Sequence, residues 1–581
     1  MQLIKRYSSL FFLILWLSSN TLAGAQTLLP ADLTEILKLN SGSKVYHRMF
    51  PVWLDWDNDN RITMIDAIIL MQKFGDPTQS PPGTYTLLAW NDLGMHCVDG
   101  NDYSVFSILP PYNNLHAQLL KKNDGLVTSG VQITFESAEN LNGSLNTNSV
   151  TKTNFWEYAE PLYGFLYGGG PLPADQGLTR IYTQSRYPQA MTFDSGNQWW
   201  AADGIPILPY NDNGTKSYYQ LVKIKAIDTT GDLLAEATAV LPVSDEMDCR
   251  KCHGTISNYT AARPASGWVN DADPEKDYKL NILMLHDEKT ATTLFGEATG
   301  GTPVLCARCH LSNALPGSGS AGIVPLTAAI HSRHAQVIDP LTGKTLAADT
   351  NRTACYSCHP GQLTKCLRGA MGGVGNINCQ DCHGNMDDVG APTRQGWLDE
   401  PNCQQCHQNG NRYTSVFISP GNLRPVTDRR FATEVNTPLA GKELYRFSTG
   451  HHGIQCEACH GATHAVYPSI EEEDNILARE IQGHAGTIAE CFGCHTTTPQ
   501  TNSGGPHGIH SVGQFWVNAH GDFAEHSGTA NCTPCHGTNL RGSQLSAAFS
   551  KKSVSTEWGI RTFTAGQQIG CYDCHNGPGG D

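Results

Sequence analysis

The sequence has few charged residues and no excess of basic ones. Only 16% of its 581 residues are Asp, Glu, Lys or Arg, and the formal net charge is −15. Soluble domains usually carry about a quarter of such residues. Proteins that bind nucleic acid depend on basic patches that neutralise phosphates. The charge balance therefore argues against a nucleic-acid partner, and the 58 glycines favour a chain rich in loops.

Long apolar runs are missing after the N-terminus. The run Leu10 to Leu17 follows Lys5 and Arg6, and the small residues Ala23 to Ala25 come after it. This run is too short to span a bilayer, and the whole pattern is that of a secretory signal peptide over residues 1–25. No Cys stands at the cleavage site, which argues against a lipid anchor. We expect a mature chain without a transmembrane segment, exported to the periplasm, the cell surface or the medium.

Methionine is scarce, with 10 residues, whereas the chain has 20 Cys and 23 His. Eighteen of the cysteines fall in nine Cys-x-x-Cys-His motifs. This spacing lets two thiols form thioethers with the haem vinyl groups and places a His under the porphyrin as proximal iron ligand. The motifs predict nine covalently bound haems, with zinc sites or disulfides as the alternative. In chain order the motifs are Cys249, Cys252 and His253; Cys306, Cys309 and His310; Cys355, Cys358 and His359; Cys379, Cys382 and His383; Cys403, Cys406 and His407; Cys456, Cys459 and His460; Cys491, Cys494 and His495; Cys532, Cys535 and His536; and Cys571, Cys574 and His575.

The remaining histidines nearly match the number of distal ligands that nine haems need. Three of them, His47, His96 and His116, precede the first motif. Because the others are close to nine in number, we expect most haems to be bis-His, which favours lower potentials than His/Met ligation. Spacing does not reveal which His serves which haem. The distal candidates are His286, His331, His334, His451, His452, His464, His484, His507, His510, His520 and His526.

Two cysteines, Cys97 and Cys366, lie outside the motifs. In an oxidising compartment, two spare thiols usually pair. We expect a Cys97–Cys366 disulfide, with ligation of a haem iron by Cys366 as the alternative.

Residues 26–75 contain one calcium-loop pattern between two short predicted helices. Acidic residues stand at positions 1, 3, 5 and 12 of the loop, and Asn60 replaces the usual Gly at position 6. Side-chain oxygens at positions 1, 3, 5 and 12, a backbone carbonyl at 7, and position 9 directly or through water would bind one Ca²⁺. The alternative is an acidic surface turn. The predicted ligands are Asp55, Asp57, Asp59, Arg61, Thr63 and Asp66.

Composition divides the rest of the chain into a linker and two larger domains. Residues 76–83 are a Pro- and Gly-containing linker, and residues 84–245 hold short runs of β-branched and aromatic residues, which predict an antiparallel, sandwich-like β domain. Residues 246–581 carry all nine motifs, about 37 residues for each, too few to build separate cores. The predicted fold is thus multidomain: a small α calcium module, a β domain, and a loop-rich haem domain with short helices. The predicted strands are Tyr85–Trp90, Tyr103–Leu109, Val131–Phe135, Met191–Phe193 and a hairpin over Tyr218–Val243.

Residues 249–581 resemble the multihaem c-type cytochromes of metal-reducing and sulfate-reducing bacteria. The resemblance rests on the nine motifs, on Gly450-His451-His452-Gly453, and on the segment from Gly505 to His510. It implies closely packed haems that pass electrons between a redox partner protein and an external or periplasmic acceptor. Residues 55–75 resemble a dockerin-type calcium repeat. Dockerins carry two repeats and this chain has one, so a cohesin-like or self-assembly partner is only a further expectation.

Two other functions are compatible with the motifs. A multihaem reductase of nitrite, hydroxylamine or a sulfur oxyanion needs one open iron position. Related enzymes often mark that haem with Lys in place of the proximal His, and none of the nine motifs has this change. A surface- or matrix-assembled cytochrome, anchored by its calcium module, is the other alternative. We predict no catalytic residue and expect an electron-transfer protein rather than an enzyme.

Overall fold

The computed structural model divides the chain into two compact units, Met1–Pro82 and Gly83–Asp581. All described residues belong to the second unit, so the predicted signal peptide, calcium ligands and most of the linker lie outside them. The described residues are 83–247, 249–361, 363–372, 377–392, 417–419, 422–423, 445–447, 449–450, 453–483, 485–488, 493–496, 514–530, 532–537, 539–542, 546, 548, 551–564 and 567–577.

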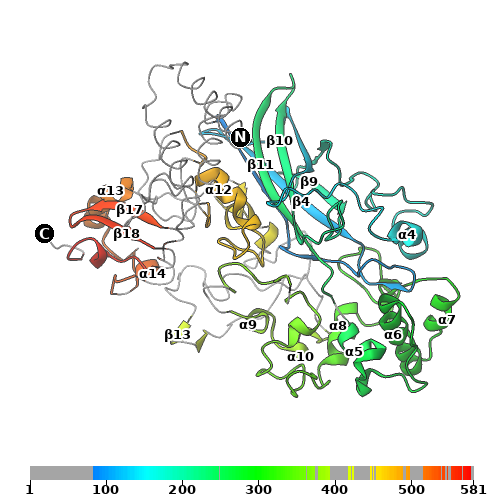
Figure 1. Ribbon diagram of the computed structural model, residues 1–581. Helices are drawn as coiled ribbons and strands as arrows, with labels where there is room; N and C mark the ends of the chain where they lie inside the picture. Colours follow the sequence, from blue (N-terminus) through cyan, green and yellow to red (C-terminus); the bar gives the residue numbers. More distant parts are fainter. Residues whose placement is uncertain are drawn as a thin grey trace, which may run out of the picture. The chain divides into compact units, whose positions relative to one another are not determined.

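Two five-stranded sheets dominate residues 84–245 (Figure 1). All of their strand pairs are antiparallel except β2 with β11, which is parallel. The predicted antiparallel β structure is therefore confirmed. The first sheet has the order β1 (Tyr85–Trp90), β4 (Tyr112–Lys121), β9 (Trp199–Pro206) and β8 (Thr192–Asp194), with β5 (Gly125–Val127) also paired to β4. The second has the order β2 (His96–Cys97), β11 (Leu233–Ser244), β10 (Tyr219–Asp228), β6 (Val131–Ser137) and β7 (Gln189–Ala190).

The hairpin of β10 and β11 shows why these residues form strands. Val222 and Ile224 of β10 point into the core and are at most 1% exposed. The alternate residues Lys223 and Lys225 point outward, and each forms an ion pair with a Glu on a neighbouring strand. This two-residue alternation is the strand period. The predicted hairpin is confirmed, with Tyr219 opposite Pro242.

The predicted strand over residues 103–109 is wrong except for two residues. Only β3 (Phe106–Ser107) forms, and it pairs in parallel with β12 (Val304–Leu305). The buried carboxylate of Asp99 accepts hydrogen bonds from the backbone N–H groups of Ile108 and Leu109 at 2.6 and 3.1 Å. These N–H groups are thus bonded to a side chain and do not extend the ladder.

The described residues between 249 and 577 form mainly short helices joined by loops, as expected, together with a few short strands. The longest helix is α6 (Pro274–Thr290), which begins at Asp273, whose side chain accepts a hydrogen bond from the Glu275 N–H at 2.9 Å. No helix among the described residues is long and apolar enough to cross a membrane. The other helices are α4 (Phe155–Tyr163), α5 (Arg250–His253), α7 (Leu294–Thr299), α8 (Leu326–His334), α9 (Cys379–His383), α10 (Met386–Val389), α11 (Cys456–His460), α12 (Ile476–Gln482), α13 (Gln514–Ser527) and α14 (Thr533–His536).

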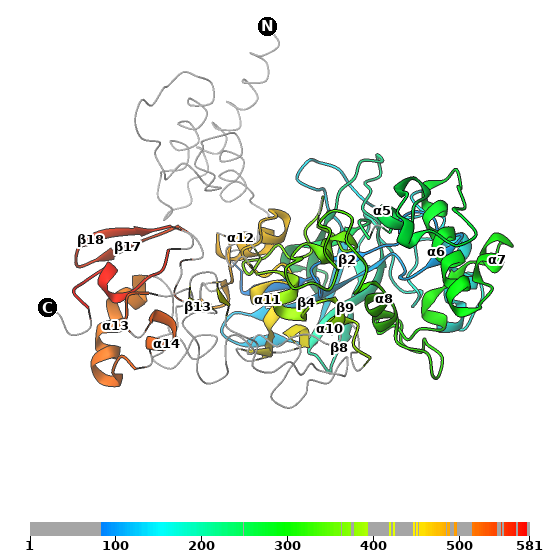
Figure 2. The same ribbon diagram turned by 90° about the horizontal axis from the view of Figure 1, so that it is seen from below.

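The hydrophobic core of the two sheets continues into the motif region. Ala458 of α11 and Leu477 of α12 are buried in the same cluster as Leu87 of β1 and Leu241 of β11. Figure 2 shows α11 and α12 beside the strands. The Gln118 side chain of β4 also bonds the backbone of residues 453 and 455. This part of the motif region is thus packed onto the β strands.

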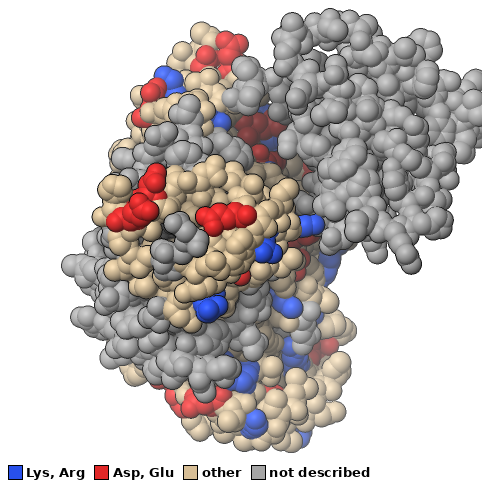
Figure 3. All heavy atoms as spheres, turned by 90° about the vertical axis from the view of Figure 1, so that its left-hand side faces the viewer, with Lys and Arg blue, Asp and Glu red and all other residues tan. Residues whose placement is uncertain are grey.

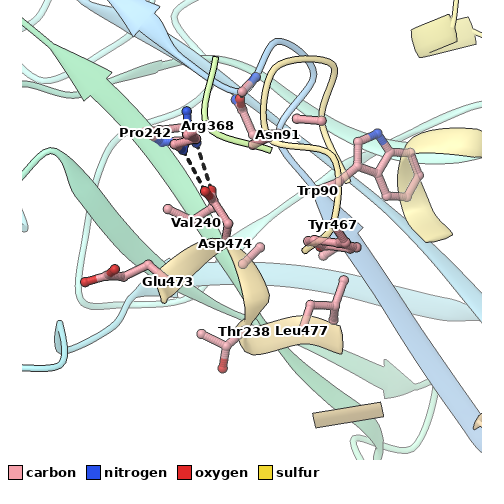
Figure 4. A pocket seen from close by; sticks show the side chains of 15 residues that line it. Trp90, Asn91, Thr238, Val240, Pro242, Arg368, Tyr467, Glu473, Asp474 and Leu477 are labelled. Carbon is pink, nitrogen blue, oxygen red and sulfur yellow. Dashed lines mark hydrogen bonds and ion pairs between the residues drawn. The ribbon is translucent and has the colours of Figure 1, made fainter. Parts of the chain in front are cut away.

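A buried ion pair lies at this junction, beside a cavity of about 20 Å³ (Figure 4). Arg368 Nε and Nη2 donate to the Asp474 carboxylate at 2.6 and 2.8 Å, and the side chains are 0% and 2% exposed. Ser469 Oγ donates to the same carboxylate at 2.6 Å. Burial acts to lower the pKa of Arg368, but Asp474 more than offsets it and the pKa is raised.

Charged side chains are sparse on the surface. On the face in Figure 3, described acidic and basic side chains are interspersed with a larger uncharged area. This distribution agrees with the 16% of charged residues in the sequence.

Candidate functional site

Each of five described motifs closes one helical turn. The His N–H donates to the carbonyl of the first Cys, at 2.8 to 3.2 Å, in the motifs that end at His253, His310, His359, His536 and His575. Residues i, i+3 and i+4 share one face of a helical turn. The Cys-x-x-Cys-His spacing therefore directs both thiols and the imidazole to the same side of the backbone.

The motif cysteines are free thiols wherever the structure describes them. Cys403, Cys406 and His407 of the fifth motif and Cys491 of the seventh lie outside the described residues. Cys535 of the eighth motif is part of α14, but its side chain is not among those described. Among the described residues, no group of three or more His, Cys, Asp or Glu is arranged to hold a metal ion.

The described motif cysteines are all at least partly accessible. Cys309, the second cysteine of the second motif, is exposed. A thiol must be accessible if it is to add to a haem vinyl group, so this placement is compatible with the predicted attachment. The attachment itself stays a prediction. The half-buried cysteines are Cys249, Cys252, Cys306, Cys355, Cys358, Cys379, Cys382, Cys456, Cys459, Cys494, Cys532, Cys571 and Cys574.

Five motif histidines face a second histidine. A metal ion bound to two imidazoles on opposite sides, at about 2.0 Å from each nitrogen, separates the ring centres by roughly 6 Å. The centroid separations are close to that value, and His520 Nε2 faces His575 Nε2 at 3.4 Å. The ring centroids are 6.1 Å apart in His253–His334, 6.4 Å in His310–His286, 6.1 Å in His359–His331, 6.2 Å in His383–His464 and 5.6 Å in His575–His520.

Three further motif histidines are described in the sixth, seventh and eighth motifs. These residues, His460, His495 and His536, are half-buried. His536 directs Nδ1 to the Ile569 carbonyl at 2.7 Å, as several of the facing histidines direct theirs to a carbonyl. The proximal role of the motif histidines stays a prediction from the motif spacing.

Backbone carbonyls orient most of the facing imidazoles. A His that donates from Nδ1 carries its lone pair on Nε2, the atom that then binds a metal, and metal-ligating histidines have such partners. The Nδ1 contacts here are His310 to the Val324 carbonyl at 2.8 Å, His331 to Thr327 at 2.8 Å, His334 to Ile330 at 2.7 Å, His464 to Leu93 at 3.1 Å, His520 to Val517 at 2.9 Å and His575 to Gly577 at 3.1 Å.

The facing histidines come from few elements. Helix α8 supplies both His331 and His334, α6 supplies His286, and α13 supplies His520. His464 follows α11, and its carbonyl accepts hydrogen bonds from the N–H groups of Arg368 and Gly369 at 2.9 and 3.0 Å. All five belong to the distal candidates of the sequence, which did not assign them to particular motifs.

The other distal candidates are less well described. His451, His452, His484, His507 and His510 lie outside the described residues. His526 is exposed on α13 and donates from Nδ1 to the Asp522 carbonyl at 2.8 Å. Its Nδ1 contact matches that of the facing histidines.

His96 and His116 differ from the facing histidines. His96 Nε2 lies 2.9 Å from Asp92, and His116 Nε2 lies 3.2 Å from Asp203. The His116 ring also stacks on Trp199 at 4.2 Å. Because carboxylates occupy Nε2, these two residues do not resemble metal ligands, and the sequence also left them out of the distal set.

Burial keeps several of the facing imidazoles neutral. It lowers the pKa of His253 and of His359 to about 4, in each case with the opposing His as a further cause. The pKa of His286 is also lowered, first by burial and then by His310. His464 is the exception: burial acts to lower its pKa, but the interaction with Cys366 outweighs it and raises the pKa to about 9, which favours the protonated form. Neutral imidazole is the form that binds a metal.

Cys97 and Cys366 are both free thiols, and they lie within electrostatic range of each other. Burial raises the pKa of Cys97, and the neighbouring Cys366 adds to this effect. Burial also acts to raise the pKa of Cys366, but His464, which hydrogen-bonds to this thiol, lowers it overall. The disulfide between them and iron ligation by Cys366 therefore stay predictions.

Large apolar side chains are exposed next to the motifs. Ile256, three residues after His253, is 93% exposed, and Leu311 and Val324, which flank His310, are 42% and 49% exposed. Tyr572, inside the last motif, is 37% exposed. Exposed apolar groups mark surfaces that bind an apolar partner. A flat, apolar cofactor at each motif would cover these side chains, so the residues present fit the haem that the sequence predicts.

No family model, no curated protein and no solved structure matches the chain.

Proposed function

We propose that this chain is an exported multihaem c-type cytochrome that passes electrons between a redox partner and an extracellular or periplasmic acceptor. The observation that carries the proposal is the set of five motif histidines, each opposed by a second His at about 6 Å. That separation suits two axial ligands of one iron.

Each motif has a defined role in this proposal. Its two cysteines hold the haem covalently, its His is the proximal ligand, and the facing His is the distal ligand. The haem supplies one-electron redox chemistry. The protein supplies burial, fixed imidazole orientation through Nδ1, and the packing that holds neighbouring motifs together.

Two imidazoles per iron favour electron relay over reduction of a small substrate. A reductase needs an iron with an exchangeable position. At the first, second, third, fourth and ninth motifs a second His is already in place. A structural zinc site takes four ligands, and among the described residues no three His, Cys, Asp or Glu side chains are gathered as such a site requires.

Export and calcium binding complete the proposal and rest on the sequence. The signal peptide would direct the chain across the membrane to the compartment where c-type haem is attached. The calcium module, with the ligands predicted between Asp55 and Asp66, would serve surface assembly or docking of a cohesin-like partner.

The test is a haem count together with a distal-ligand variant. The purified holoprotein should contain nine haems by pyridine haemochrome and mass, all low-spin by EPR. His520→Ala should convert one centre to high spin, because His520 faces His575. The matched control His116→Ala should convert none. Absence of covalent haem, or a low-spin spectrum unchanged in His520→Ala, would overturn the proposal.

A further inference from the structure

We infer that six of the proposed haem centres form one continuous electron path in the spatial order second, first, third, fourth, sixth and seventh. This inference rests on the proposed function. It adds the order of the centres along the path, which the proposed function does not specify. The path departs from sequence order at its start, because the second centre lies at the end and the first lies between the second and the third. Five links between motifs carry the argument.

The first and second motifs share one small hydrophobic cluster. Cys249 and Cys306 both pack against this cluster, which contains Tyr278 of α6 and Phe106 of β3. The Tyr278 and Phe106 rings meet edge to face at 6.4 Å. Strand β12, paired with β3, ends directly before Cys306. The attachment cysteines of the two motifs thus lie on one shared group of aromatic and aliphatic side chains.

The first and third motifs are joined by helix α8. His334 faces His253 of the first motif, and His331 faces His359 of the third. Residues three apart on a helix are neighbours, with Cβ atoms about 5–6 Å apart. One helix would therefore supply the distal ligands of two centres and would hold these two centres close together.

The third and fourth motifs are held in direct contact. The thiols of Cys355 and Cys379 lie close enough to each other to interact electrostatically. Arg352 forms an ion pair with Asp381, and Gln380 Nε2 donates to the Asn351 carbonyl at 3.0 Å. Because each thiol would carry a haem edge, the two porphyrins would meet at this point.

The fourth motif continues to the sixth and seventh. His464, which faces His383, lies four residues after His460 of the sixth motif, in a turn closed by the hydrogen bond from the Tyr467 N–H to the His460 carbonyl at 2.7 Å. The Ile488 N–H, near the seventh motif, donates to the Cys459 carbonyl at 2.9 Å. Cys459 and Cys494 both pack against the core of the β strands. The path therefore runs from the α6 end of the motif region to the junction with the sheets.

The link through α8 is tested by EPR on variants that remove the proposed distal ligands of one or two irons. His334→Ala and His331→Ala should each give one high-spin centre, and Arg333→Ala, on the same helix, should give none. In the His331→Ala/His334→Ala double variant, the two high-spin irons should broaden each other, so that the signal is wider than the sum of the singles. The control double variant His334→Ala/His520→Ala opens the first and ninth centres and should give the simple sum.

The outcomes distinguish a failure of the inferred order of centres from a failure of the proposed function. If neither single variant gives a high-spin centre, the proposed haem ligation fails. If the single variants behave as expected but the His331→Ala/His334→Ala signal is only the sum, the inferred order fails.

Cryo-EM of the unsubstituted holoprotein gives a second measurement that does not depend on variants. The iron nearest to that of the second motif should be that of the first, and the fourth iron should have the third and sixth as neighbours. Any other order of the irons overturns the inference.

Discussion

Removal of the Asp474 carboxylate should cause a large loss of stability. In Asp474→Asn, the Arg368 guanidinium keeps its charge but loses a partner that it contacts through two nitrogens. Both side chains are almost fully buried, at 0% and 2% exposure. Breaking one partner of such a pair costs about 3–5 kcal/mol, because an uncompensated charge stays buried.

The assay is urea unfolding of the full chain followed by circular dichroism. A loss of stability without a change in the exposed surface lowers the midpoint and leaves the slope unchanged. Two variants serve as controls. Arg479→Ala breaks the exposed pair of Arg479 and Glu472 and should cost about 1 kcal/mol or less. Arg368→Met with Asp474→Leu replaces both charges by apolar groups of similar size and should stay within about 2 kcal/mol of the unsubstituted protein.

The reasoning is refuted if Asp474→Asn costs no more than Arg479→Ala. It is also refuted if the double replacement loses as much as the single one, because the loss would then not come from an unpaired charge. Arg368 and Gly369 hold the carbonyl of His464. Asp474→Asn should therefore also alter the EPR signal of the fourth centre under the proposed ligation.

Three further predictions concern other parts of the chain. Burial acts to raise the pKa of Asp92, but the hydrogen bond to His96 and nearby positive groups outweigh it and hold the pKa below its ordinary value of 3.8. The stability from this ionised carboxylate is present above that value and lost as the pH falls below it, so Asp92→Asn should flatten the acid side of the stability profile in thermal melts at different pH values. Cys97 and Cys366 should resist alkylation until a reductant is added; mass spectrometry that finds both labelled without reductant contradicts the disulfide. The mature protein should bind one Ca²⁺ by elemental analysis, and Asp55→Ala should abolish it; an unchanged calcium content would identify the loop as a surface turn.

The strands that were predicted and those that were missed differ in composition. Tyr85–Trp90 is almost wholly apolar or β-branched, the hairpin of β10 and β11 alternates such residues with polar ones, and both form as predicted. Several strands were missed, β9 among them. Strand β4 was missed although it is central to its sheet. It contains Asn113 and Gln118, which disfavour strands in isolation, but both are 0% exposed because their amides bond to the backbone of other segments. Only the folded chain brings those acceptors, the carbonyls of Pro242 and Gly453, to the strand.

The pairing of the histidines was likewise only partly predictable from the sequence. The motif spacing predicts which histidines are proximal, and the histidine count predicts that most have a distal partner. The i, i+3 spacing of His331 and His334 fits one face of a helix and would have indicated a shared role. The pairing of His383 with His464 depends on the contact of residues 368–370 with 464–466. No local pattern in the sequence encodes that contact.

The positions of the facing histidines also set an order for maturation, if haem is attached as proposed. A chain exported from its N-terminus presents His286, His331 and His520 before the motifs that they face, which end at His310, His359 and His575. The first and fourth motifs are different, because His334 follows His253 and His464 follows His383. A partly exported chain would therefore carry completed second and third centres while the fourth still lacked its distal ligand. Its iron would stay open to water and small oxidants until the segment after α11 had emerged and packed against Arg368.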